Sequence, residues 1–433
     1  MNITRKEILP GVWLNHLRTD KFKTAFMSIS LLTQLSRETA SLTALIPPVL
    51  RRGSFSYPDM EKLTARMDEL YGASIEGTNR KLGEILAIGL AGSWPEECFL
   101  PEGSDELENC IGLFCEMLLN PATRGGLFLP AFVESEKEKL CDLIRSRIND
   151  RRSYSIIRCV EEMCCCEDYS VGRFGTVEDV EDINYKKLTR HYRELIKTSP
   201  VEIFYCGRDD AKRVSAKLRQ HMAAFPRGEI NYDIGTEIRM NALEAEPRFL
   251  CEEMEMNQGR LVIGWRLGDC MDDPDPAAIK VFNSLFGGDV NSRLFMNVRE
   301  KLHLAYDAGS MLHFKKGILL AAAGIDADKF EIARDEIFAQ LDAIKRGEFT
   351  KEELENAKFI PASNIRAFAD SPFALEGFYM NRILEGTDYS PEDFARLIEE
   401  VEAEDVIKVA NSLECDMIYF LRPEETDGEE IEE

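Results

Sequence analysis

Histidines and cysteines are the side chains of this sequence best suited to bind a metal or to act as nucleophiles. The chain of 433 residues has 5 histidines and 12 cysteines. A zinc site on a helix needs two histidines four residues apart, and a cysteine site needs a Cys-x-x-Cys pair. The cysteines lack this pairing, and no helical pair occurs among the histidines, which are His16, His191, His221, His303 and His313. The sequence therefore predicts no metal and no cofactor in this chain.

Three consecutive cysteines, Cys164, Cys165 and Cys166, stand out. Adjacent cysteines cannot form ordinary disulfides with one another, and a chain of this length needs no disulfides to fold. We expect free thiols in a reducing cytoplasm. The N-terminus lacks the apolar core of a signal peptide, and no apolar run approaches the roughly 18 residues that span a bilayer. Nucleophilic catalysis by this cluster stays open as a third possibility, since no histidine lies nearby in the sequence.

The charge balance limits the partners. There are 53 basic and 78 acidic residues, which gives a net charge of −25. This excess repels phosphate backbones, so we expect neither nucleic acid nor an anionic membrane surface as a partner. Part of the excess lies in a solvated acidic tail, residues 423–433. Hydrophobic residues make up 44% and charged residues 30%, as in soluble globular proteins.

The sequence contains an internal repeat. In the second half, Phe286-Gly287-Gly288 is followed by an amphipathic helix pattern, then by a tyrosine with small residues, and then by an apolar run at 317–325. In the first half, Gly53 is followed by the same features in the same order, and the apolar run lies at 84–91. A period of roughly 200 residues is too long for a solenoid repeat. We therefore expect two duplicated domains, at residues 1–224 and 248–422. A linker at residues 225–247 joins them, and the acidic tail at residues 423–433 follows the second domain.

Strand and helix patterns define the fold class. Strands are expected at 11–18, 23–32, 85–90, 201–205, 260–266, 318–325 and 417–421. Helices fill the segments between them, and the first helix of the second half begins with Asp275 as its cap and ends at Gly287. Because strands and helices are grouped rather than alternating, the sequence predicts an α+β fold. Each domain would be a mostly antiparallel sheet with helices packed on one face, forming half of a clamshell.

The repeat region resembles the insulinase/pitrilysin/processing-peptidase family of zinc peptidases. The resemblance rests on Ser292-Arg293-Leu294-Phe295, Arg299-Glu300-Lys301 and Leu304-Ala305-Tyr306, with weaker support from Leu70-Tyr71-Gly72-Ala73 and Phe174-Gly175-Thr176. It covers essentially the whole chain. The chain is most similar to small bacterial members that work as unequal pairs, including the subfamily named for a role in modifying elongation factor P.

The resemblance implies an H-x-x-E-H zinc motif on a helix of the first domain. Alignment on Gly53 places this motif at residues 44–48, where the sequence is Ala-Leu-Ile-Pro-Pro and no functional residue of the motif remains. The two prolines are expected to interrupt the helix. Glu134 and Glu136 fall on the helix of the third ligand, and we expect them to be surface charges beside lysines. The chain alone should be inactive.

The resemblance also implies that Arg299 and Tyr306 contact the substrate backbone near the scissile bond. A guanidinium donates several fixed hydrogen bonds to peptide carbonyls, and a phenol adds one more donor. The alternative is that Arg299 pairs with a surface carboxylate while the Tyr306 ring lies in the core. Tyr71 is expected to be a packing residue left by the duplication.

The expected function is that of a non-catalytic, substrate-binding subunit in a heterodimeric zinc-peptidase-like complex. A homologous partner would supply H-x-x-E-H and zinc, and the pair would process peptides. The alternatives are a catalytically inactive peptide-binding or scaffold protein and, less favoured, a stand-alone metallopeptidase.

Overall fold

The computed structural model describes residues 3–424 and forms two compact units. The first unit contains residues 3–146, 171–236 and 370–390, and the second contains 147–170, 237–369 and 391–424. Each unit therefore includes one segment from the other half of the sequence. The expected acidic tail lies outside the described residues from residue 425 onward.

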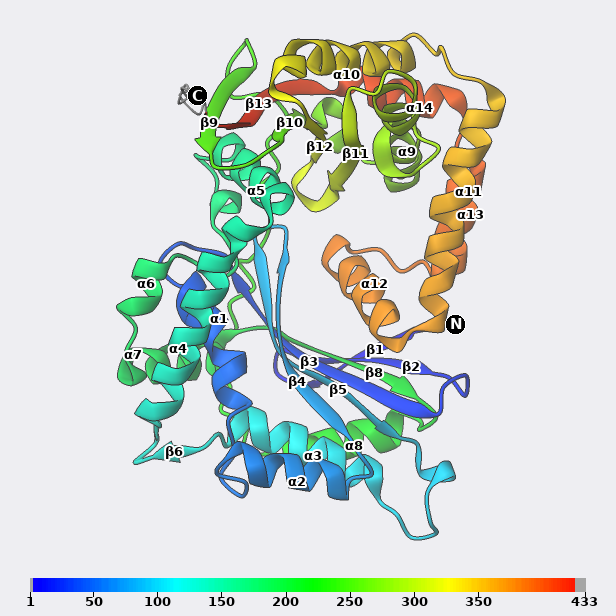
Figure 1. Cartoon of the computed structure of the whole chain (residues 1–433). Helices are drawn as coiled ribbons and strands as arrows, with labels where there is room; N and C mark the ends of the chain where they lie inside the picture. The colour runs from blue at the N-terminus through cyan, green and yellow to red at the C-terminus, as the bar shows by residue number, and fades with distance from the viewer. Residues whose placement is uncertain (1–2, 425–433) are drawn as a thin grey trace, which may run out of the picture. The chain divides into compact units, whose positions relative to one another are not determined.

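The first unit contains a six-stranded sheet in the order β1-β2-β8-β3-β5-β4 (Figure 1). Its neighbours are antiparallel except β2 and β8, which are parallel. The strands are β1 (Ile3–Leu9), β2 (Val12–Arg18), β3 (Thr24–Gln34), β4 (Ser74–Leu82), β5 (Ile85–Pro95) and β8 (Val201–Gly207).

The second unit contains a five-stranded sheet that repeats this arrangement in the order β11-β12-β10-β13-β9. Here too the neighbours are antiparallel except the last pair, β13 and β9. Order and orientation match β4-β5-β3-β8-β2 strand for strand, so the predicted α+β class and its duplication are confirmed. The strands are β9 (Arg248–Met254), β10 (Gly259–Arg266), β11 (Ala305–His313), β12 (Ile318–Ile325) and β13 (Glu414–Pro423).

Most helices of the first unit cover one face of its sheet, where Met27, Ile29 and Leu31 of β3 enter a common core. These helices are α1 (Ala40–Leu50), α2 (Met60–Glu69), α3 (Glu106–Leu119), α4 (Pro130–Arg145), α6 (Val177–Glu181), α7 (Tyr185–Thr198) and α8 (Ala211–His221). Alternate residues of a strand point to opposite faces. Ser28 accordingly faces the other side and donates a hydrogen bond of 3.0 Å to Glu376 of α12 (Pro372–Glu385), a helix from the second half of the sequence.

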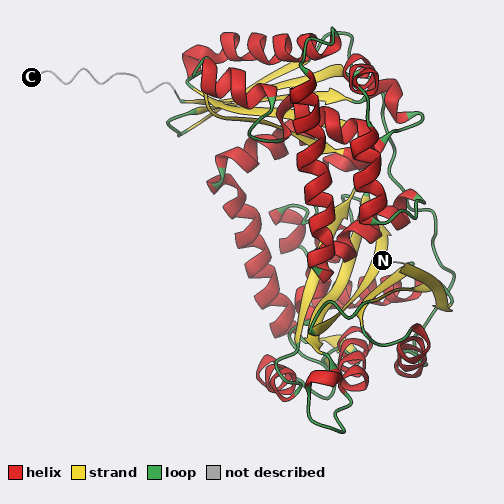
Figure 2. Ribbon diagram, turned by 90° about the vertical axis from the view of Figure 1, so that its right-hand side faces the viewer, coloured by secondary structure: helices red, strands yellow, loops and turns green. Residues whose placement is uncertain are grey.

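The second unit shows the same exchange in the opposite direction. Helix α5 (Arg151–Met163), from the first half of the sequence, packs Val160 and Met163 on one face of the sheet, against Val262 and Leu320. The other face, where Trp265 meets Phe286 and Phe338 at ring distances of 5.9 and 5.8 Å, carries most of the helices (Figure 2). The remaining helices are α9 (Pro276–Asn283), α10 (Phe330–Lys345), α11 (Lys351–Ala367), α13 (Pro391–Glu400) and α14 (Ala403–Ser412). Within residues 3–424, no helix is long and apolar enough to cross a membrane.

Two local expectations are wrong. Helix α1 is not interrupted by its prolines but continues through Pro47 and Pro48 to Leu50. Pro47 and Pro48 have no N–H to donate to the carbonyls of Thr43 and Ala44 four residues earlier, so the helix lacks two hydrogen bonds, yet it continues to Leu50. Gly287 does not stop a helix either, because it lies inside the π-helix η5 (Ser284–Gly288). A β-carbon there would be 2.5 Å from the Ser310 backbone nitrogen, so the glycine permits a close approach to β11.

Candidate functional site

Arg299 belongs to the π-helix η6 (Leu294–Lys301), which packs Leu294 and Val298 into the core of the second unit. Its guanidinium carbon lies 4.5 Å from the centre of the Phe295 ring, and its Nε lies 3.5 Å from Glu300 Oε1. The side chain is 41% exposed. The pairing with a surface carboxylate, expected as the alternative, is therefore present but long. No hydrogen bond joins the terminal amino groups of Arg299 to any residue from 3 to 424.

Tyr306 lies on β11, the edge strand of the second sheet. The register between β11 and β12 shifts between Ala305 and Asp307, so Tyr306 is the extra residue of a β-bulge. Tyr306 is 68% exposed, so the alternative of a ring in the core is wrong. The bulge is fixed beside it by an ion pair of 2.5 Å between Arg260 on β10 and Asp307.

A glycine on β12 provides the space for this ion pair. Asp307 is the register partner of Gly324. A β-carbon on Gly324 would lie 2.4 Å from Arg260 Nη1 and 2.5 Å from Asp307 Oδ1. A side chain at position 324 would displace the ends of the Arg260 and Asp307 side chains and so disturb the ion pair beside Tyr306.

Exposed apolar side chains surround Arg299 and Tyr306 in the sequence. Val290, Met296 and Leu302 are 60%, 47% and 44% exposed. We call residues 290–306 the η6–β11 segment. A combination of exposed apolar, aromatic and arginine side chains is typical of interaction surfaces.

The place where the resemblance put the zinc motif offers no metal ligand. Ala44, Leu45 and Ile46 are buried apolar residues of α1, followed by two prolines. Within residues 3–424, no group of three or more histidine, cysteine or acidic side chains is arranged to hold a metal ion. Zinc binds through imidazole, thiolate or carboxylate groups, so the residues present do not fit it.

Glu136 is not the surface charge that was expected. Its carboxylate is buried and lies 3.3 Å from Arg52 Nη1 and 2.7 Å from Lys139 Nζ. Its neighbour Glu134 does agree with the expectation, being 58% exposed and 3.3 Å from Lys137. A buried carboxylate needs a cation or several hydrogen bonds, and here Arg52, which follows α1, provides the charge.

One histidine does lie beside α1. His191 on α7 shares a hydrogen bond of 2.8 Å with the hydroxyl of Thr43, through its Nε2 atom. Burial lowers the pKa of His191 to about 4, so its ring is neutral near pH 7. Spacing along the sequence could not have revealed this contact, because the two residues are far apart in the chain. A single neutral histidine bound to a hydroxyl does not constitute a catalytic site.

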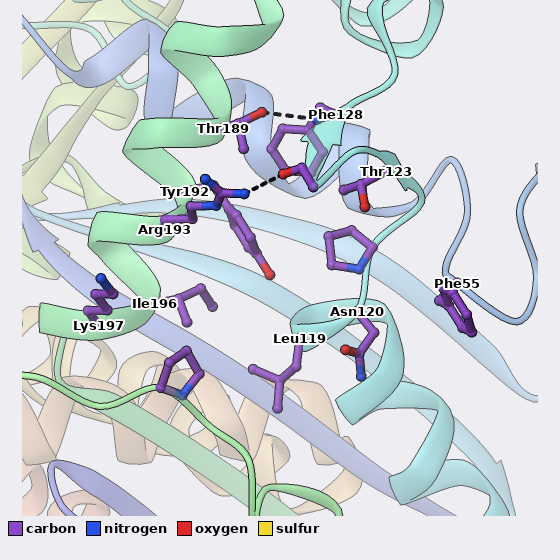
Figure 3. A pocket seen from close by; sticks show the side chains of 13 residues that line it. Phe55, Leu119, Asn120, Thr123, Phe128, Thr189, Tyr192, Arg193, Ile196 and Lys197 are labelled. Carbon is purple, nitrogen blue, oxygen red and sulfur yellow. Dashed lines mark hydrogen bonds between the residues drawn. The ribbon is translucent and has the colours of Figure 1, made fainter.

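The first unit also contains a cavity of about 290 Å³ between α7 and residues 119–128 (Figure 3). The Tyr192 hydroxyl donates to the Leu118 carbonyl at 2.6 Å, and Arg193 donates to the Gly126 carbonyl. The Thr189 hydroxyl accepts from the Phe128 backbone. These polar groups are used in holding the wall together, so they do not form a reactive group inside the cavity.

The structure contradicts the expectation that Tyr71 is a packing residue left by the duplication. Tyr71 is 49% exposed and not a packing residue, and its backbone is left-handed, with φ of 52°. The residue with the matching conformation in the second unit is His303, with φ of 50°, in the turn between η6 and β11. Tyr306 lies beyond that turn, within the strand. Its exposure is therefore not an inherited feature of the repeated turn.

Comparisons with known proteins agree with this fold. Residues 182–360 match the family model described as the peptidase M16 inactive domain. The chain is 31% identical to a probable inactive metalloprotease YmfF of Bacillus subtilis over 414 residues, which cover 95% of this chain and 96% of that one.

Two solved structures are similar over nearly the whole length. A conserved protein from Enterococcus faecalis has a TM-score of 0.89 at 27% identity, covering 99% of this chain and 100% of that one. A peptidase M16 inactive domain from Pseudomonas fluorescens has a TM-score of 0.78 at 18% identity, with 98% of each chain covered, and shows a common fold. The chain therefore belongs to the peptidase M16 family, and its sequence lacks the H-x-x-E-H motif at the aligned residues 44–48.

Proposed function

We propose that this chain is the non-catalytic, substrate-binding subunit of a heterodimeric cytoplasmic peptidase. A homologous partner with H-x-x-E-H would hold the zinc and activate the attacking water. This chain would bind the extended peptide that the partner cleaves. The absence of H-x-x-E-H at residues 44–48, together with the exposed Arg299 and Tyr306, supports a division of labour between two chains.

The observation that carries the proposal is the state of these two side chains. The Arg299 guanidinium lies over the Phe295 ring and 3.5 Å from Glu300, while 41% of the side chain remains exposed. Tyr306 is 68% exposed. A planar guanidinium and a phenol are suited to donate hydrogen bonds to peptide carbonyls. The same donors could stabilise negative charge that develops on a carbonyl oxygen during cleavage.

The position of Tyr306 at a sheet edge indicates how the peptide would bind. β11 pairs with β12 on one side only, so its other edge can accept an added strand. A peptide added there would make backbone hydrogen bonds that do not depend on its sequence. The exposed apolar side chains of the η6–β11 segment would then contact its side chains and set the preference.

A variant of Arg299 tests the proposal against a scaffold role. The partner would be identified by co-purification from native cells, and each chain would be assayed alone and mixed. We expect activity and zinc only when the partner is present. Arg299→Ala should leave assembly unchanged and lower kcat/KM by about tenfold or more, as loss of a charge-assisted hydrogen bond implies.

Arg334 provides the matched control. It also lies over a phenylalanine, with 5.6 Å to the Phe330 ring, and pairs with a neighbouring acid, Asp335, at 2.8 Å. Arg334→Ala should retain full activity. If Arg299→Ala behaves like Arg334→Ala, the chain is a scaffold; peptidase activity of the lone chain that a chelator abolishes would contradict the proposal altogether.

A further inference from the structure

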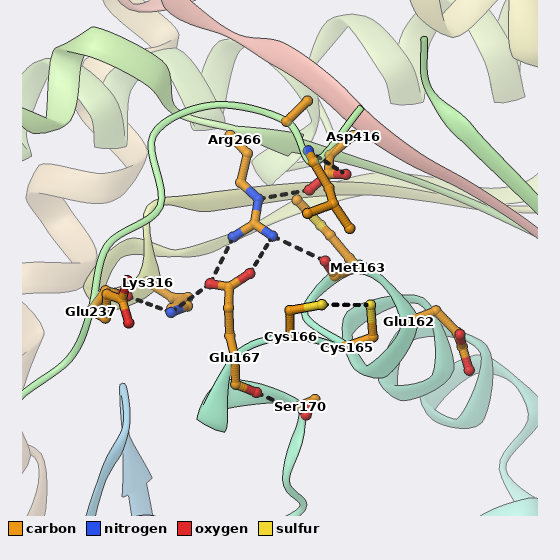
Figure 4. A network of polar contacts seen from close by, with 12 residues as sticks. Glu162, Met163, Cys165, Cys166, Glu167, Ser170, Glu237, Arg266, Lys316 and Asp416 are labelled. Atoms are coloured by element: carbon orange, nitrogen blue, oxygen red, sulfur yellow. Dashed lines mark hydrogen bonds and ion pairs between the residues drawn. The ribbon is translucent and has the colours of Figure 1, made fainter. Parts of the chain in front are cut away.

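The three consecutive cysteines lie in the turn after α5, and they differ in exposure. Cys164 is buried, whereas Cys165 and Cys166 are exposed. Their two sulfur atoms are 3.8 Å apart (Figure 4). None of the 12 cysteines, all of which lie in the described residues, forms a disulfide. The chain thus presents two thiols in contact on the surface of the second unit.

The surroundings hold this pair in place. Arg248 on β9 donates from Nη1 to the Cys165 sulfur at 3.7 Å and from Nη2 to the buried Asp416 carboxylate at 2.6 Å. The hydrogen bond with Cys165 raises the pKa of the Cys166 thiol. Cys166 therefore keeps its proton while its neighbour is unreacted, as expected of a dithiol in which both groups cannot ionise together.

We propose that Cys165 and Cys166 form a reversible redox site, a vicinal dithiol that low-molecular-weight disulfides oxidise to a disulfide. The Cys165 thiolate attacks one sulfur of the oxidant and releases the first small thiol, which leaves a mixed disulfide. The Cys166 thiolate then attacks the Cys165 sulfur and releases the second small thiol. One S–S bond forms in the protein and one is broken in the oxidant, and the two protons of the protein thiols pass to the released thiols.

The geometry makes this disulfide easy to reduce. Adjacent Cα atoms are about 3.8 Å apart, whereas an ordinary disulfide joins Cα atoms about 4.4–6.8 Å apart. The ring that closes through one peptide bond is therefore strained. Strained and exposed disulfides are the labile ones, in contrast to bridges that stabilise secreted proteins. The site agrees with the expectation that no ordinary bridge forms here.

Formation of the disulfide would affect buried ion pairs of the second unit through the next residue, Glu167. Its carboxylate lies 2.6 Å from Arg266 Nη2 and 2.7 Å from Lys316 Nζ, and both cations are fully buried (Figure 4). Closing the disulfide brings the sulfurs to about 2.05 Å and must change the backbone of the turn. Glu167 would be displaced from cations that depend on it, so the oxidised chain should have a lower thermal midpoint.

The test uses the full-length chain treated with glutathione disulfide and then alkylated. We expect the tryptic peptide from Cys159 to Arg173 to carry two alkyl groups fewer than the same peptide from the reduced chain, and dithiothreitol added before alkylation to reverse this loss. Cys165→Ser and Cys166→Ser should each abolish this loss. Cys98→Ser and Cys251→Ser, which remove exposed cysteines elsewhere, should not affect it.

A trivalent arsenical gives a second measurement on the unmodified sequence. Phenylarsine oxide should bind once per chain, and an excess of a monothiol should not displace it. The bound arsenical should prevent formation of the Cys165–Cys166 disulfide. A glutathione adduct that persists on Cys165 without ring closure would overturn the proposal. So would closure that survives in Cys165→Ser, since the bridge would then use Cys159 or Cys164.

Discussion

The guanidinium of Arg52 lies 3.3 Å from the buried carboxylate of Glu136, on the helix where the resemblance placed a zinc ligand. The guanidinium also lies over the Phe132 ring, at 5.1 Å. The positive charge of Arg52 therefore compensates the buried negative charge of Glu136. In the first unit this place is filled by an ion pair and buried apolar side chains.

Removing the charge of Glu136 should destabilise the protein. Glu136→Gln leaves Arg52 and Lys139 without their buried partner, and we expect the free energy of unfolding to fall by about 1–3 kcal/mol. Glu76→Gln is the control, because Glu76 pairs with Arg51 at 3.3 Å but is 69% exposed. Its effect should stay below about 0.5 kcal/mol. Chemical denaturation measures both, and equal losses would show that Glu136 is not specially dependent on burial.

His191 should make stability depend on pH between its two pKa values. The folded pKa is about 4 and the ordinary value is 6.5, so the unfolded chain binds a proton first as pH falls. The contribution of neutral His191 is complete above about pH 6.5 and is lost by pH 4, up to about 3 kcal/mol. His191→Gln removes this dependence. We expect the stability difference between wild type and variant to shrink from pH 7 to pH 4, and a constant difference would contradict the assignment.

Glu167 should be among the most sensitive charged residues of the second unit. Glu167→Gln leaves Arg266 and Lys316, both with 0% side-chain exposure, short of a negative charge. Breaking a buried ion pair from one side costs about 3–5 kcal/mol. The nearby Glu162→Gln is the control, because that carboxylate is 37% exposed and pairs with Arg158. Thermal unfolding should separate the two variants clearly.

Gly324 tests whether the bulge positions Tyr306. In Gly324→Ala the new methyl group would meet the ends of the Arg260 and Asp307 side chains, so both must shift and their ion pair is disturbed. We expect a loss of about 1–3 kcal/mol in stability and lower turnover by the assembled peptidase, with partner binding retained. Gly377→Ala is the control: a β-carbon at Gly377 meets no atom within 4 Å, and this helical position should become slightly more stable. Normal turnover by Gly324→Ala would show that the orientation of Tyr306 does not depend on this pair.

The strands that the sequence predicted are the interior ones. β2, β3, β5, β8, β10, β12 and β13 consist mostly of buried residues, because both faces of these strands are covered. The strands β1, β4, β9 and β11 were missed. All four are edge strands, and exposed and half-buried residues mix along them without a clear apolar pattern.

Contacts between residues far apart in the chain limited what the sequence could predict about the site. The motif around Arg299 and Tyr306 was found from sequence, and their role in binding substrate stays a prediction. The burial of Glu136 could not be foreseen, because its partner Arg52 lies far away in the chain and local spacing favours an exposed pair with Lys139. The exchange of α5 and α12 was missed for the same reason. No local pattern tells a helix which sheet it will cover.

That exchange constrains how the protein can be made. The first unit needs residues 370–390, which leave the ribosome only when most of the second unit has already been synthesised. Until then Arg80 has no Glu376 to bind, and the face of β3 that carries Ser28 is bare. Folding therefore cannot finish one unit before starting the other, and a gene cut within residues 225–247 would yield two incomplete fragments.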